Sequence, residues 1–253
     1  MNKIAIIIPS RLDAKRLPNK PLKLINNKEM ILHVYDAAKK SKAGEVYVAT
    51  PDQEIIDKVK SYGGNAILTS QNHQTGTDRV FEVFKKTLQE KPKIIVNLQG
   101  DMPNINPESI KQLIDHMWDD KCEIGTLASA LLVDEVYNKN VVKVFTERLP
   151  NNKLEEAIKN LTFSPVSGFD RSITTDHNDY AYHHIGIYGF TREALIKYVN
   201  LKRSKLELER NLEQMRAFEN NMRINVGFVN TKPLSVDTEK DLDEIQKIMG
   251  TNE

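Results

Sequence analysis

IAIIIPSRLDAKRLPNKPL, residues 4–22, joins an uninterrupted apolar run to a cationic loop. The run at residues 4–8 lacks polar alternation, which is typical of a strand buried on both faces at the centre of a parallel sheet. In open α/β sheets, ligands bind just beyond the carboxyl ends of such strands. The loop at residues 9–22 therefore occupies an expected ligand-binding position.

Four cationic side chains fall within this loop: Arg11, Lys15, Arg16 and Lys20. Two prolines, Pro18 and Pro21, stiffen the loop and keep it out of helical conformation. A stiff cationic loop at this position favours an anionic ligand, most naturally a polyphosphate. The ordinary alternative is a charged loop that is simply solvated, and the loop alone leaves both interpretations open.

Downstream of the loop, helical and strand patterns alternate. Helices are expected at residues 30–40, 52–61 and 77–89, and further strands at 45–50, 65–69 and 93–98. This alternation predicts parallel pairing with right-handed crossovers. We therefore expect a doubly wound, mostly parallel, Rossmann-like α/β sheet over residues 1 to about 115.

The second half of the chain is less regular. Helices are expected at residues 107–117, 191–199, 207–219 and 241–249, and strands at 123–133, 141–145, 182–190 and 223–229. Residues 149–179 are polar and poor in periodicity, so we expect an irregular excursion or a lid there.

Composition limits the class of protein. The chain has 253 residues, 40% of them hydrophobic and 28% charged, and a formal net charge of +1, so nucleic-acid binding is not indicated. The single cysteine, Cys122, excludes an internal disulfide and is expected to be a buried spacer in a strand rather than a nucleophile. There is no signal-peptide pattern and no apolar run of transmembrane length, so we expect a cytoplasmic protein.

Common phosphate-binding motifs are missing from the sequence. It contains no Gly-x4-Gly-Lys-Ser/Thr, and no Gly-x-Gly-x-x-Gly follows the first strand. We therefore expect a phosphate ligand to be held by side chains and a few backbone amides.

Two acidic motifs are candidate cation sites. Asp101 follows the fourth strand after Gly100, which allows a sharp turn or a close backbone approach. A carboxylate at such a strand end suits Mg²⁺, although an ordinary turn with Asp101 as a capping residue is the alternative. Asp237 precedes the last helix, and the sequence favours it as the N-cap over a second metal ligand.

A third motif, HQTGTDR at residues 73–79, follows the third strand. Thr77 is the expected cap of the next helix, whose first-turn Asp78 suits the helix dipole. The helix N-terminus is also a natural place for a polar base or a phosphate. Arg79 either pairs locally or reaches the ligand.

Seven motifs together resemble the CMP-Kdo synthetases, or 3-deoxy-manno-octulosonate (Kdo) cytidylyltransferases. They are the loop at residues 8–22, residues 73–79, NLQGD-x-P at 97–103, NVVKV at 140–144, HIGIYGF at 184–190, LEQMR at 212–216 and VDT at 236–238. These motifs keep the order and spacing of that family over nearly the whole chain.

The resemblance implies an enzyme that transfers CMP from CTP to the anomeric hydroxyl of Kdo and releases pyrophosphate, for lipopolysaccharide biosynthesis. It implies Mg²⁺ as the cofactor and a homodimer as the assembly. Within one cytidylyltransferase domain over residues 1–253, it implies a nucleotide-binding part at 1–120, a smaller sugar-acid and dimerisation part at 121–230, and a return to the main sheet at 231–253.

The resemblance also implies the site residues. Nucleotide-binding residues would be Arg11, Arg16, Lys20, Thr75, Gly76, Arg79 and Gln99. Asp101 and Asp237 would be the Mg²⁺ ligands and, with Lys20, the catalytic group. The sugar acid would contact Gln99, His184, Tyr188, Glu213 and Gln214. Attack of an alcohol on an α-phosphate needs positioning and cations more than covalent help, and no general base is evident.

Three positions depart from the family pattern. Met102 replaces a usual Glu, which removes a polar contact but keeps the metal carboxylate. Pro165 replaces a common Arg that contacts the sugar acid, and Arg171 is the candidate substitute if the loop folds back. Lys205 replaces a frequent Pro and is expected to be neutral.

The sugar-pocket residues also have ordinary interpretations. His184 on an apolar strand could be an ordinary core histidine whose hydrogen bonds are made within the protein. Tyr188, four residues further on, lies on the same face of the strand, so the two side chains could line either a common pocket or a common patch of core. Glu213 and Gln214, adjacent on a helix, cannot both face one ligand. That helix could instead serve a dimer interface through its apolar side chains Leu206, Leu208, Leu212 and Met215.

Two functional alternatives follow from the departures. Pro165 motivates the same reaction on 8-amino-Kdo or on another 2-keto-3-deoxy sugar acid. Met102 and the missing Arg together motivate a non-catalytic relative that binds nucleotide or sugar.

Overall fold

The computed structural model describes residues 3–14, 16–89, 91–118, 122–147, 149–173 and 179–250. Lys15, one of the four loop cations, lies outside the described residues. The chain forms two compact units, Met1–Lys111 with Pro233–Glu253, and Gln112–Lys232. Helix α4 (Pro107–Met117) contains the first boundary between them.

The first unit alternates strands and helices. Its strands are β1 (Ile4–Pro9), the short hairpin β2 (Leu24–Ile25) and β3 (Lys28–Glu29), β4 (Glu45–Thr50), β5 (Ala66–Leu68) and β6 (Ile94–Leu98). Its helices are the 3₁₀ turn Lys20–Leu22, α1 (Met30–Lys40), α2 (Gln53–Ser61), α3 (Gly76–Glu82) with a π-helical turn Val83–Thr87, and α9 (Glu239–Gly250).

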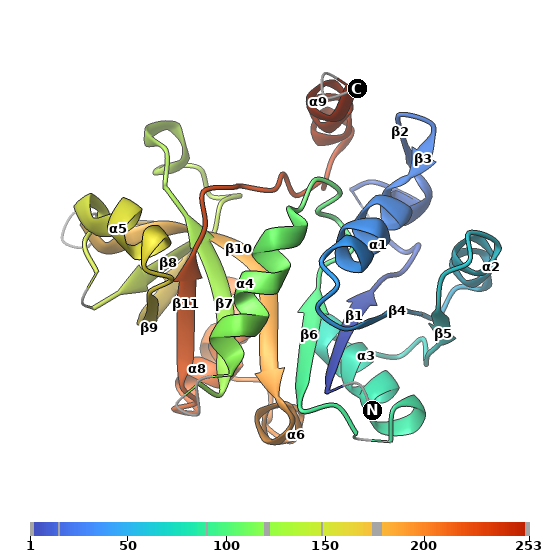
Figure 1. Ribbon diagram of the computed structural model, residues 1–253, viewed down its shortest axis with the longest axis horizontal. Coiled ribbons are helices and arrows are strands. Elements are labelled where there is room, and N and C mark those ends of the chain that lie inside the picture. The colour runs from blue at the N-terminus through green and yellow to red at the C-terminus, as the bar shows by residue number, and fades with distance from the viewer. Residues whose placement is uncertain are drawn as a thin grey trace. The chain divides into compact units, whose positions relative to one another are not determined.

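The parallel sheet of this unit has the strand order β5-β4-β1-β6. Ile6 pairs with Val46 on one side and Val96 on the other, and all three are buried. Right-handed crossovers place α1 and α2 on one face and α3 on the other, and α1 is seen in front of the sheet in Figure 1. The predicted doubly wound fold is confirmed here.

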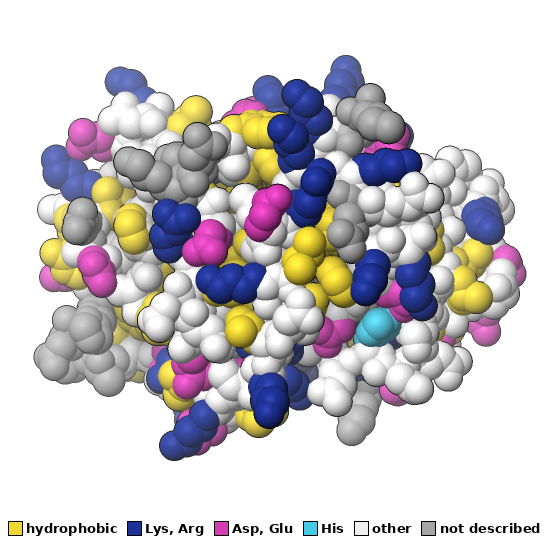
Figure 2. Space-filling view, turned by 90° about the horizontal axis from the view of Figure 1, so that it is seen from below, with side chains coloured by type: hydrophobic (Ala, Val, Ile, Leu, Met, Phe, Trp, Pro, Cys, Tyr) yellow, Lys and Arg dark blue, Asp and Glu magenta, His cyan; other side chains and the backbone are white. Residues whose placement is uncertain are grey.

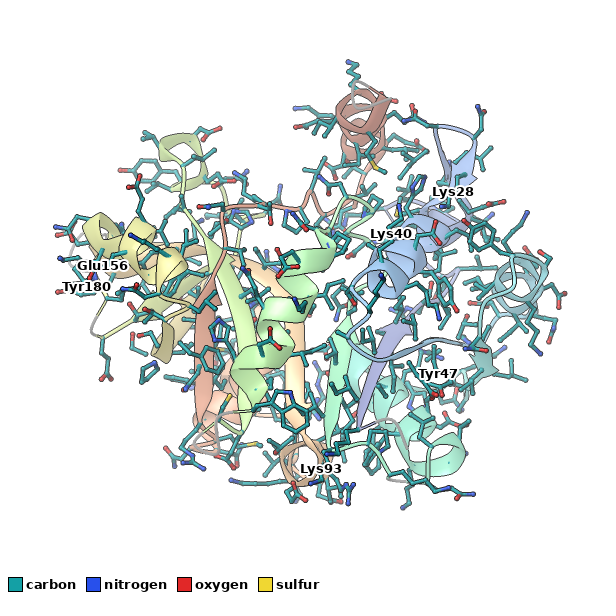
Figure 3. The ribbon with its side chains drawn as sticks, viewed as in Figure 1. Lys28, Lys40, Tyr47, Lys93, Glu156 and Tyr180 are labelled. Atoms are coloured by element: carbon teal, nitrogen blue, oxygen red, sulfur yellow. The ribbon has the colours of Figure 1, made fainter. Side chains whose placement is uncertain are left out.

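The cationic loop is anchored in an apolar cluster beside α9. Its members come from the loop, the hairpin, α1 and the C-terminal segment: Leu17, Ile25, Met30, Val236, Leu242 and Ile245. Lys28, labelled in Figure 3, pairs with Asp36 of α1 and lies 5.1 Å from the ring centroid of Tyr62. The hairpin is therefore fixed to α1 by charge and to α9 by apolar burial.

The second unit carries a mixed sheet. Its strands are β7 (Ile124–Ser129), β8 (Lys143–Thr146), β9 (Phe163–Asp170), β10 (Ala181–Thr191) and β11 (Ile224–Phe228). Its helices are 3₁₀ turns at Val133–Glu135 and Asn151–Lys153, then α5 (Leu154–Lys159), α6 (Arg192–Val199), α7 (Lys205–Arg210) and α8 (Gln214–Glu219). The strand order is β10-β7-β11-β9-β8, in which β11 and β7 are parallel and the other pairs antiparallel.

Two paired glycines let α4 approach this sheet. Gly125 of β7 lies opposite Gly189 of β10. A Cβ at Gly125 would meet Met117 Sδ at 2.5 Å, and one at Gly189 would meet Met117 Cγ at 2.8 Å. The close contact of α4 with β7 and β10 (Figure 1) therefore depends on the missing side chains.

The structure corrects the expectation of an irregular segment at residues 149–179. Within the described part, α5 and the eight-residue strand β9 are regular, and β9 pairs with both β8 and β11. The sequence of β9 hides the strand because Pro165 and Gly168 interrupt the apolar alternation.

The predicted helix at residues 207–219 is also wrong as a single element. It is two short helices, α7 and α8, separated at Asn211, whose φ of 53° is left-handed. Asparagine tolerates this conformation, which ends the first helix.

Cys122 is buried, as expected, but lies just before β7 rather than in it. In the described part of the chain, no helix has both the length and the apolarity needed to cross a membrane. On the face drawn in Figure 2, Lys and Arg alternate with Asp and Glu instead of forming one continuous basic surface.

Candidate active site

The cationic loop leaves β1 through fixed backbone contacts. Ser10 N donates to Ala49 O at 2.9 Å, and Leu12 N donates to the Asp52 carboxylate at 2.8 Å. Asn19 has a left-handed φ of 56° and leads into the 3₁₀ turn, where buried Pro21 follows Lys20. The loop is therefore held at both ends, which directs the Lys20 side chain.

Lys20 joins two carboxylates from distant parts of the first unit. Its Nζ donates to Asp101 Oδ2 at 2.9 Å and to Asp237 Oδ1 at 3.0 Å. Arg16 Nη2 lies 2.9 Å from the other oxygen of Asp237. The side chains of Lys20, Asp101 and Asp237 are 17%, 25% and 38% exposed, so the group is partly open to solvent.

Backbone hydrogen bonds bring Asp237 to this position. Val236 N donates to Asp101 O at 2.9 Å, and Leu234 N donates to Asn104 Oδ1 at 2.9 Å. The C-terminal segment is thereby fastened along the loop that follows β6. The two carboxylates that the family resemblance implies as metal ligands therefore both contact one cation, the Lys20 ammonium.

The prediction that Asp237 caps the last helix is wrong. Thr238 Oγ1 accepts from Asp241 N at 3.3 Å, and the Asp241 carboxylate accepts from Thr238 N at 2.8 Å and Asp237 N at 3.0 Å. This reciprocal arrangement satisfies the helix start. The Asp237 side chain is left for the two cations.

The charges of this group shift its ionisation. Burial acts to raise the pKa of Asp237, but Lys20 and Arg16 outweigh it and hold that pKa below its ordinary value. Burial acts to lower the pKa of Lys20, but Asp101 and Asp237 outweigh it and raise that pKa. Asp237 is thus stabilised as a carboxylate and Lys20 as an ammonium.

Predicted nucleotide residues at the start of α3 and directly after β6 lie close together. The cap of α3 is Thr75, whose hydroxyl accepts from Asp78 N at 3.2 Å; the predicted cap, Thr77, instead accepts from Asn97 Nδ2 at 3.1 Å. Gln99 Nε2 donates to Asn97 Oδ1 at 3.1 Å. A Cβ on Gly76 would lie 3.4 Å from Pro9 and 3.9 Å from Gln99 Oε1.

Gly76, Gln99 and the end of β1 are therefore neighbours at the carboxyl edge of the sheet. This is the position where open α/β sheets bind ligands.

Arg79 is the buried member of the predicted nucleotide set. Its Nη1 donates to the Thr69 hydroxyl and, at 3.0 Å, to Ser70 O, so the local-pairing alternative describes its contacts. Burial, and then the nearby charge of Arg11, lower the pKa of Arg79. Arg11 itself is exposed, and its positive charge lies close enough to act on the guanidinium of Arg79.

Sequence reasoning missed Ser10. Its hydroxyl is buried at the end of β1 and has no hydrogen-bond partner among the described residues. A buried unpaired hydroxyl is costly, and this one lies at the sheet edge where open α/β sheets bind ligands. A signal was present, because Ser10 directly follows the predicted central strand.

The second unit gathers the predicted sugar-pocket residues of β10. The rings of His184 and Tyr188 have centroids 5.5 Å apart, and Phe169 of β9 meets His184 edge-on at 5.1 Å. His184 is 8% exposed. Burial lowers the pKa of His184 to about 3, and burial followed by the Glu213 carboxylate raises the pKa of Tyr188.

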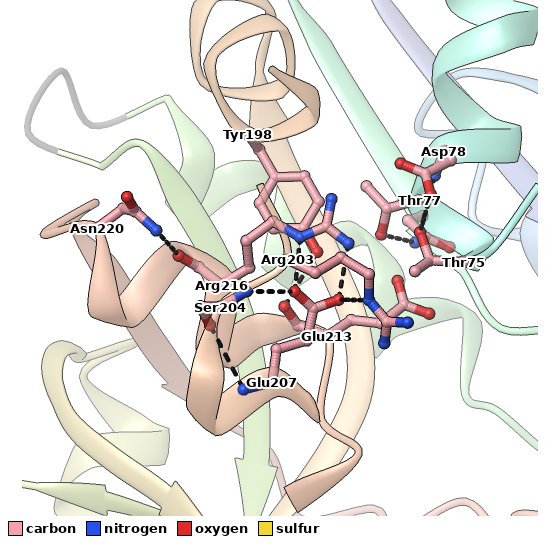
Figure 4. A network of polar contacts seen from close by, with 11 residues as sticks. Thr75, Thr77, Asp78, Tyr198, Arg203, Ser204, Glu207, Glu213, Arg216 and Asn220 are labelled. Atoms are coloured by element: carbon pink, nitrogen blue, oxygen red, sulfur yellow. Dashed lines mark hydrogen bonds and ion pairs between the residues drawn. The ribbon is translucent and has the colours of Figure 1, made fainter. Parts of the chain in front are cut away.

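A buried ion pair positions the other two sugar-pocket residues. Arg216 donates to both oxygens of Glu207 at 2.7 and 2.8 Å, and its guanidinium lies 4.6 Å from the ring centroid of Tyr198 (Figure 4). Tyr198 Oη donates to Glu213 O at 3.0 Å. Glu213 is the N-cap residue of α8 and buried Gln214 its first residue, so the ion pair fixes both.

The structure shows the burial and contacts of the residues that depart from the family pattern. Met102 is buried and Pro165 is exposed on β9. Arg171 Nη1 donates to Lys139 O at 3.1 Å and Asn140 O at 3.2 Å, so its guanidinium is occupied by backbone carbonyls. The proposed substitution of Arg171 for the missing Arg gains no support from these contacts.

The apolar side chains suggested for a dimer interface are partly buried and partly exposed. Leu212 and Met215 are buried within the second unit, whereas Leu208 is 57% exposed. Only part of that apolar set is available to another chain.

The cytidylyltransferase family model matches residues 5–224. A 4-diphosphocytidyl-2C-methyl-D-erythritol synthase from Anaerococcus prevotii superposes with a TM-score of 0.62 at 14% identity over 98% of each chain, which is a similarity of fold.

More similar proteins share a single description. A 3-deoxy-manno-octulosonate cytidylyltransferase from Thermodesulfovibrio yellowstonii is 40% identical over 97% of both chains, and one from Bartonella tribocorum is 39% identical over 97% of this chain and 98% of the relative. A CMP:2-keto-3-deoxy-manno-octonic acid synthetase solved in complex with CTP has a TM-score of 0.86 at 32% identity, over 99% of this chain and 100% of its own. The chain therefore belongs to the 3-deoxy-manno-octulosonate cytidylyltransferase family.

Proposed function

We propose that this chain transfers CMP from CTP to the anomeric hydroxyl of Kdo, forming CMP-Kdo and pyrophosphate for lipopolysaccharide biosynthesis. The observation that carries the proposal is the contact of Lys20 with Asp101 and Asp237, at 2.9 and 3.0 Å, beside the carboxyl end of β1. It occurs in a chain whose relatives of about 40% identity are cytidylyltransferases for this sugar acid.

The first unit would supply the charge that phosphoryl chemistry requires. Arg11, Arg16 and Lys20 would contact the triphosphate, while Thr75, Gly76, Arg79 and Gln99 would line the nucleotide site. These groups hold the α-phosphate in line with the incoming alcohol and neutralise charge on the departing pyrophosphate. A positioned alcohol and a stabilised leaving group leave little work for a general base.

Mg²⁺ is the proposed cofactor, held by Asp101 and Asp237. The fit rests on two carboxylates that already converge on one cation, the Lys20 ammonium. Mg²⁺ is commonly held by one or two carboxylates, with water and substrate phosphates completing its shell. When bound, it would supply Lewis-acid stabilisation of the phosphates.

The second unit would hold the sugar acid. His184 and Tyr188 present uncharged polar groups, and Glu213 and Gln214 are fixed by the buried pair of Glu207 with Arg216. The resemblance also implies a contact of Gln99 with the acid. This set would recognise hydroxyl groups by hydrogen bonding.

A cytoplasmic homodimer is the proposed state of the enzyme. Cys122 is buried and forms no disulfide, which is compatible with a reducing compartment, and exposed Leu208 offers apolar surface for a second chain. Light scattering of the purified protein should give twice the mass of one chain, and a monomeric mass would contradict this.

A panel of acids tests the function. Kdo, 8-amino-Kdo and other 2-keto-3-deoxy sugar acids are each offered with CTP and Mg²⁺, and pyrophosphate release is measured. We expect the highest kcat/KM with Kdo. Preference for 8-amino-Kdo would instead support the alternative acid suggested by Pro165, and CTP binding without turnover on any acid would support a non-catalytic relative.

A further inference from the structure

A bulge interrupts the pairing of β10 with β7. Ile185 lies opposite Leu127, but the next pair joins Tyr188 to Thr126, so residues 186–187 have no opposite residues in β7. Because two residues are inserted, the alternation of faces is preserved and Tyr188 returns to the face of His184. The short distance between these two rings depends on this bulge.

One hydroxyl closes the bulge. Thr126 Oγ1 is 2.8 Å from Ile187 O and 3.3 Å from Ile185 O, the carbonyl oxygens on either side of the inserted backbone. The same oxygen is 2.9 Å from His184 Nε2. Thr126 is completely buried, so water does not replace these contacts.

Counting protons assigns the direction of each hydrogen bond. A threonine hydroxyl has one proton to donate and two lone pairs that accept. If it donated to His184, two carbonyl oxygens would face the hydroxyl oxygen without a proton between them. The proton therefore goes to the carbonyls, chiefly to Ile187, and His184 Nε2–H donates to Thr126 Oγ1.

The other ring nitrogen of His184 then carries a lone pair. A neutral imidazole has one N–H, so protonated Nε2 leaves Nδ1 as an acceptor. Burial keeps this ring neutral at physiological pH. Among the described residues, Nδ1 has no hydrogen-bond partner, while Phe169 and Tyr188 flank the ring.

We propose that Thr126 is a positioning residue that holds His184 in the neutral Nε2–H form, so that Nδ1 accepts a hydrogen bond from a hydroxyl of the sugar acid. The proposal rests on the proposed function in placing the acid at His184. It defines one determinant of specificity, because the site requires a donor at this point of the substrate. An acid lacking that hydroxyl would leave Nδ1 unpaired.

Nitrogen-15 NMR of the histidine-labelled full chain tests the tautomer without any substrate. The His184 signal, assigned by its loss in His184→Gln, should show a protonated Nε2 and an unprotonated Nδ1. Protonation at Nδ1 would overturn the proposal. This result is independent of whether Kdo is the true substrate.

Steady-state kinetics tests the consequence for the substrate. Thr126→Val keeps the side-chain shape but removes the hydroxyl, and we expect the KM for Kdo to rise about tenfold while the KM for CTP stays within about twofold. Thr126→Ser, which restores the hydroxyl, should recover most of the loss. An unchanged KM for Kdo in a folded Thr126→Val protein would overturn the proposal.

The NMR and kinetic measurements distinguish failure of the proposed function from failure of the role assigned to Thr126. If wild-type protein releases no pyrophosphate with Kdo, the proposed function fails while the NMR result still decides the tautomer. If Thr126→Val does not fold, Thr126→Ser and the wild-type spectrum remain decisive, because loss of the Nε2–H form in the Ser variant would contradict the role assigned to the hydroxyl.

Discussion

Two polar groups in this chain are built on opposite electrostatic principles. The group of Arg16, Lys20, Asp101 and Asp237 is charged, and its Asp237 side chain is 38% exposed. The second group is built on His184 and Thr126, which are uncharged; His184 is buried and Thr126 fully enclosed. The first is held by ion pairs across long sequence separations, and the second by one hydroxyl within a sheet.

The difference matches what each group would bind. A triphosphate and a divalent cation are strongly charged. Ion pairs that are partly exposed to solvent can release their internal partners and bind these charges instead, at a moderate cost in free energy. Hydroxyl groups of a sugar are distinguished by the direction of hydrogen bonds, and a buried neutral site with a fixed tautomer provides that direction. The comparison predicts that the two groups respond differently to mutation, pH and metal.

The largest effect is expected from neutralising a carboxylate in the charged group. Asp101→Asn should lower kcat with Kdo by about 10³-fold, equivalent to roughly 4 kcal/mol, because the proposed Mg²⁺ would lose one of its ligands. Turnover is measured by pyrophosphate release at saturating substrates. Asp243→Asn, an exposed carboxylate on α9, is the matched control and should be unaffected; equal losses in both variants would contradict the assignment.

A smaller and selective effect is expected from the neutral group. His184→Gln should raise the KM for Kdo by about 10- to 100-fold, since a well-directed buried hydrogen bond is lost, while the KM for CTP changes little. His183→Gln is the control, because the neighbouring side chain contacts Glu135 instead, with Nδ1 at 3.1 Å. A parallel rise in both Michaelis constants would show that the two groups are not separable.

The free energy of unfolding should depend on pH in different ranges for the neutral group and the charged group. The pKa of His184 is lowered to about 3 in the folded chain. Below about pH 6.5, therefore, His184 binds a proton in the unfolded chain but not in the folded chain. Stability from this residue is therefore lost as pH falls, by about 2 kcal/mol between pH 7 and pH 5. Asp237, with its lowered pKa, adds no change until the pH approaches about 4.

Urea unfolding of wild type and His184→Asn at several pH values isolates this term. The variant should lose less stability on acidification, while His33, His116 and His183, whose pKa values are also lowered, contribute to both proteins alike. Identical pH slopes would contradict a buried neutral His184.

The smallest effect concerns metal binding without nucleotide. Lys20→Met removes the ammonium that neutralises Asp101 and Asp237, so Mn²⁺, used as a probe for Mg²⁺, should bind about tenfold more tightly to the metal-free protein. Calorimetry measures this directly. Lys23→Met, whose partner is Glu239, is the control; unchanged Mn²⁺ affinity in Lys20→Met would place the metal elsewhere.

The first unit could be largely predicted because its signals are local. An apolar run such as residues 4–8 has one reasonable place in a soluble α/β protein, and it forms β1, the strand between β4 and β6. Lys20 and Asp101 each follow a buried strand, so their proximity at one sheet edge was foreseeable. The place of Asp237 was implied only by the family resemblance, since it depends on the hydrogen bond from Val236 N to Asp101 O, which no local pattern shows.

The second unit was harder because its determinants are non-local. Strand β9 contains Pro165 and Gly168 and is defined by its pairing with β8 and β11 rather than by its own alternation. The bulge at residues 186–187 leaves no trace in the apolar pattern of β10. Thr126, which closes it, is an ordinary threonine in a strand until its three contacts are known.

Phosphorus-31 NMR of one reaction mixture tests the central claim most directly. Purified chain is incubated with CTP, Kdo and Mg²⁺, and the phosphorus signals are followed over time. We predict one CMP–Kdo phosphodiester for each pyrophosphate released, and no change when any one component is omitted. Persistence of CTP in the complete mixture, or release of pyrophosphate without a sugar phosphodiester, would contradict the account.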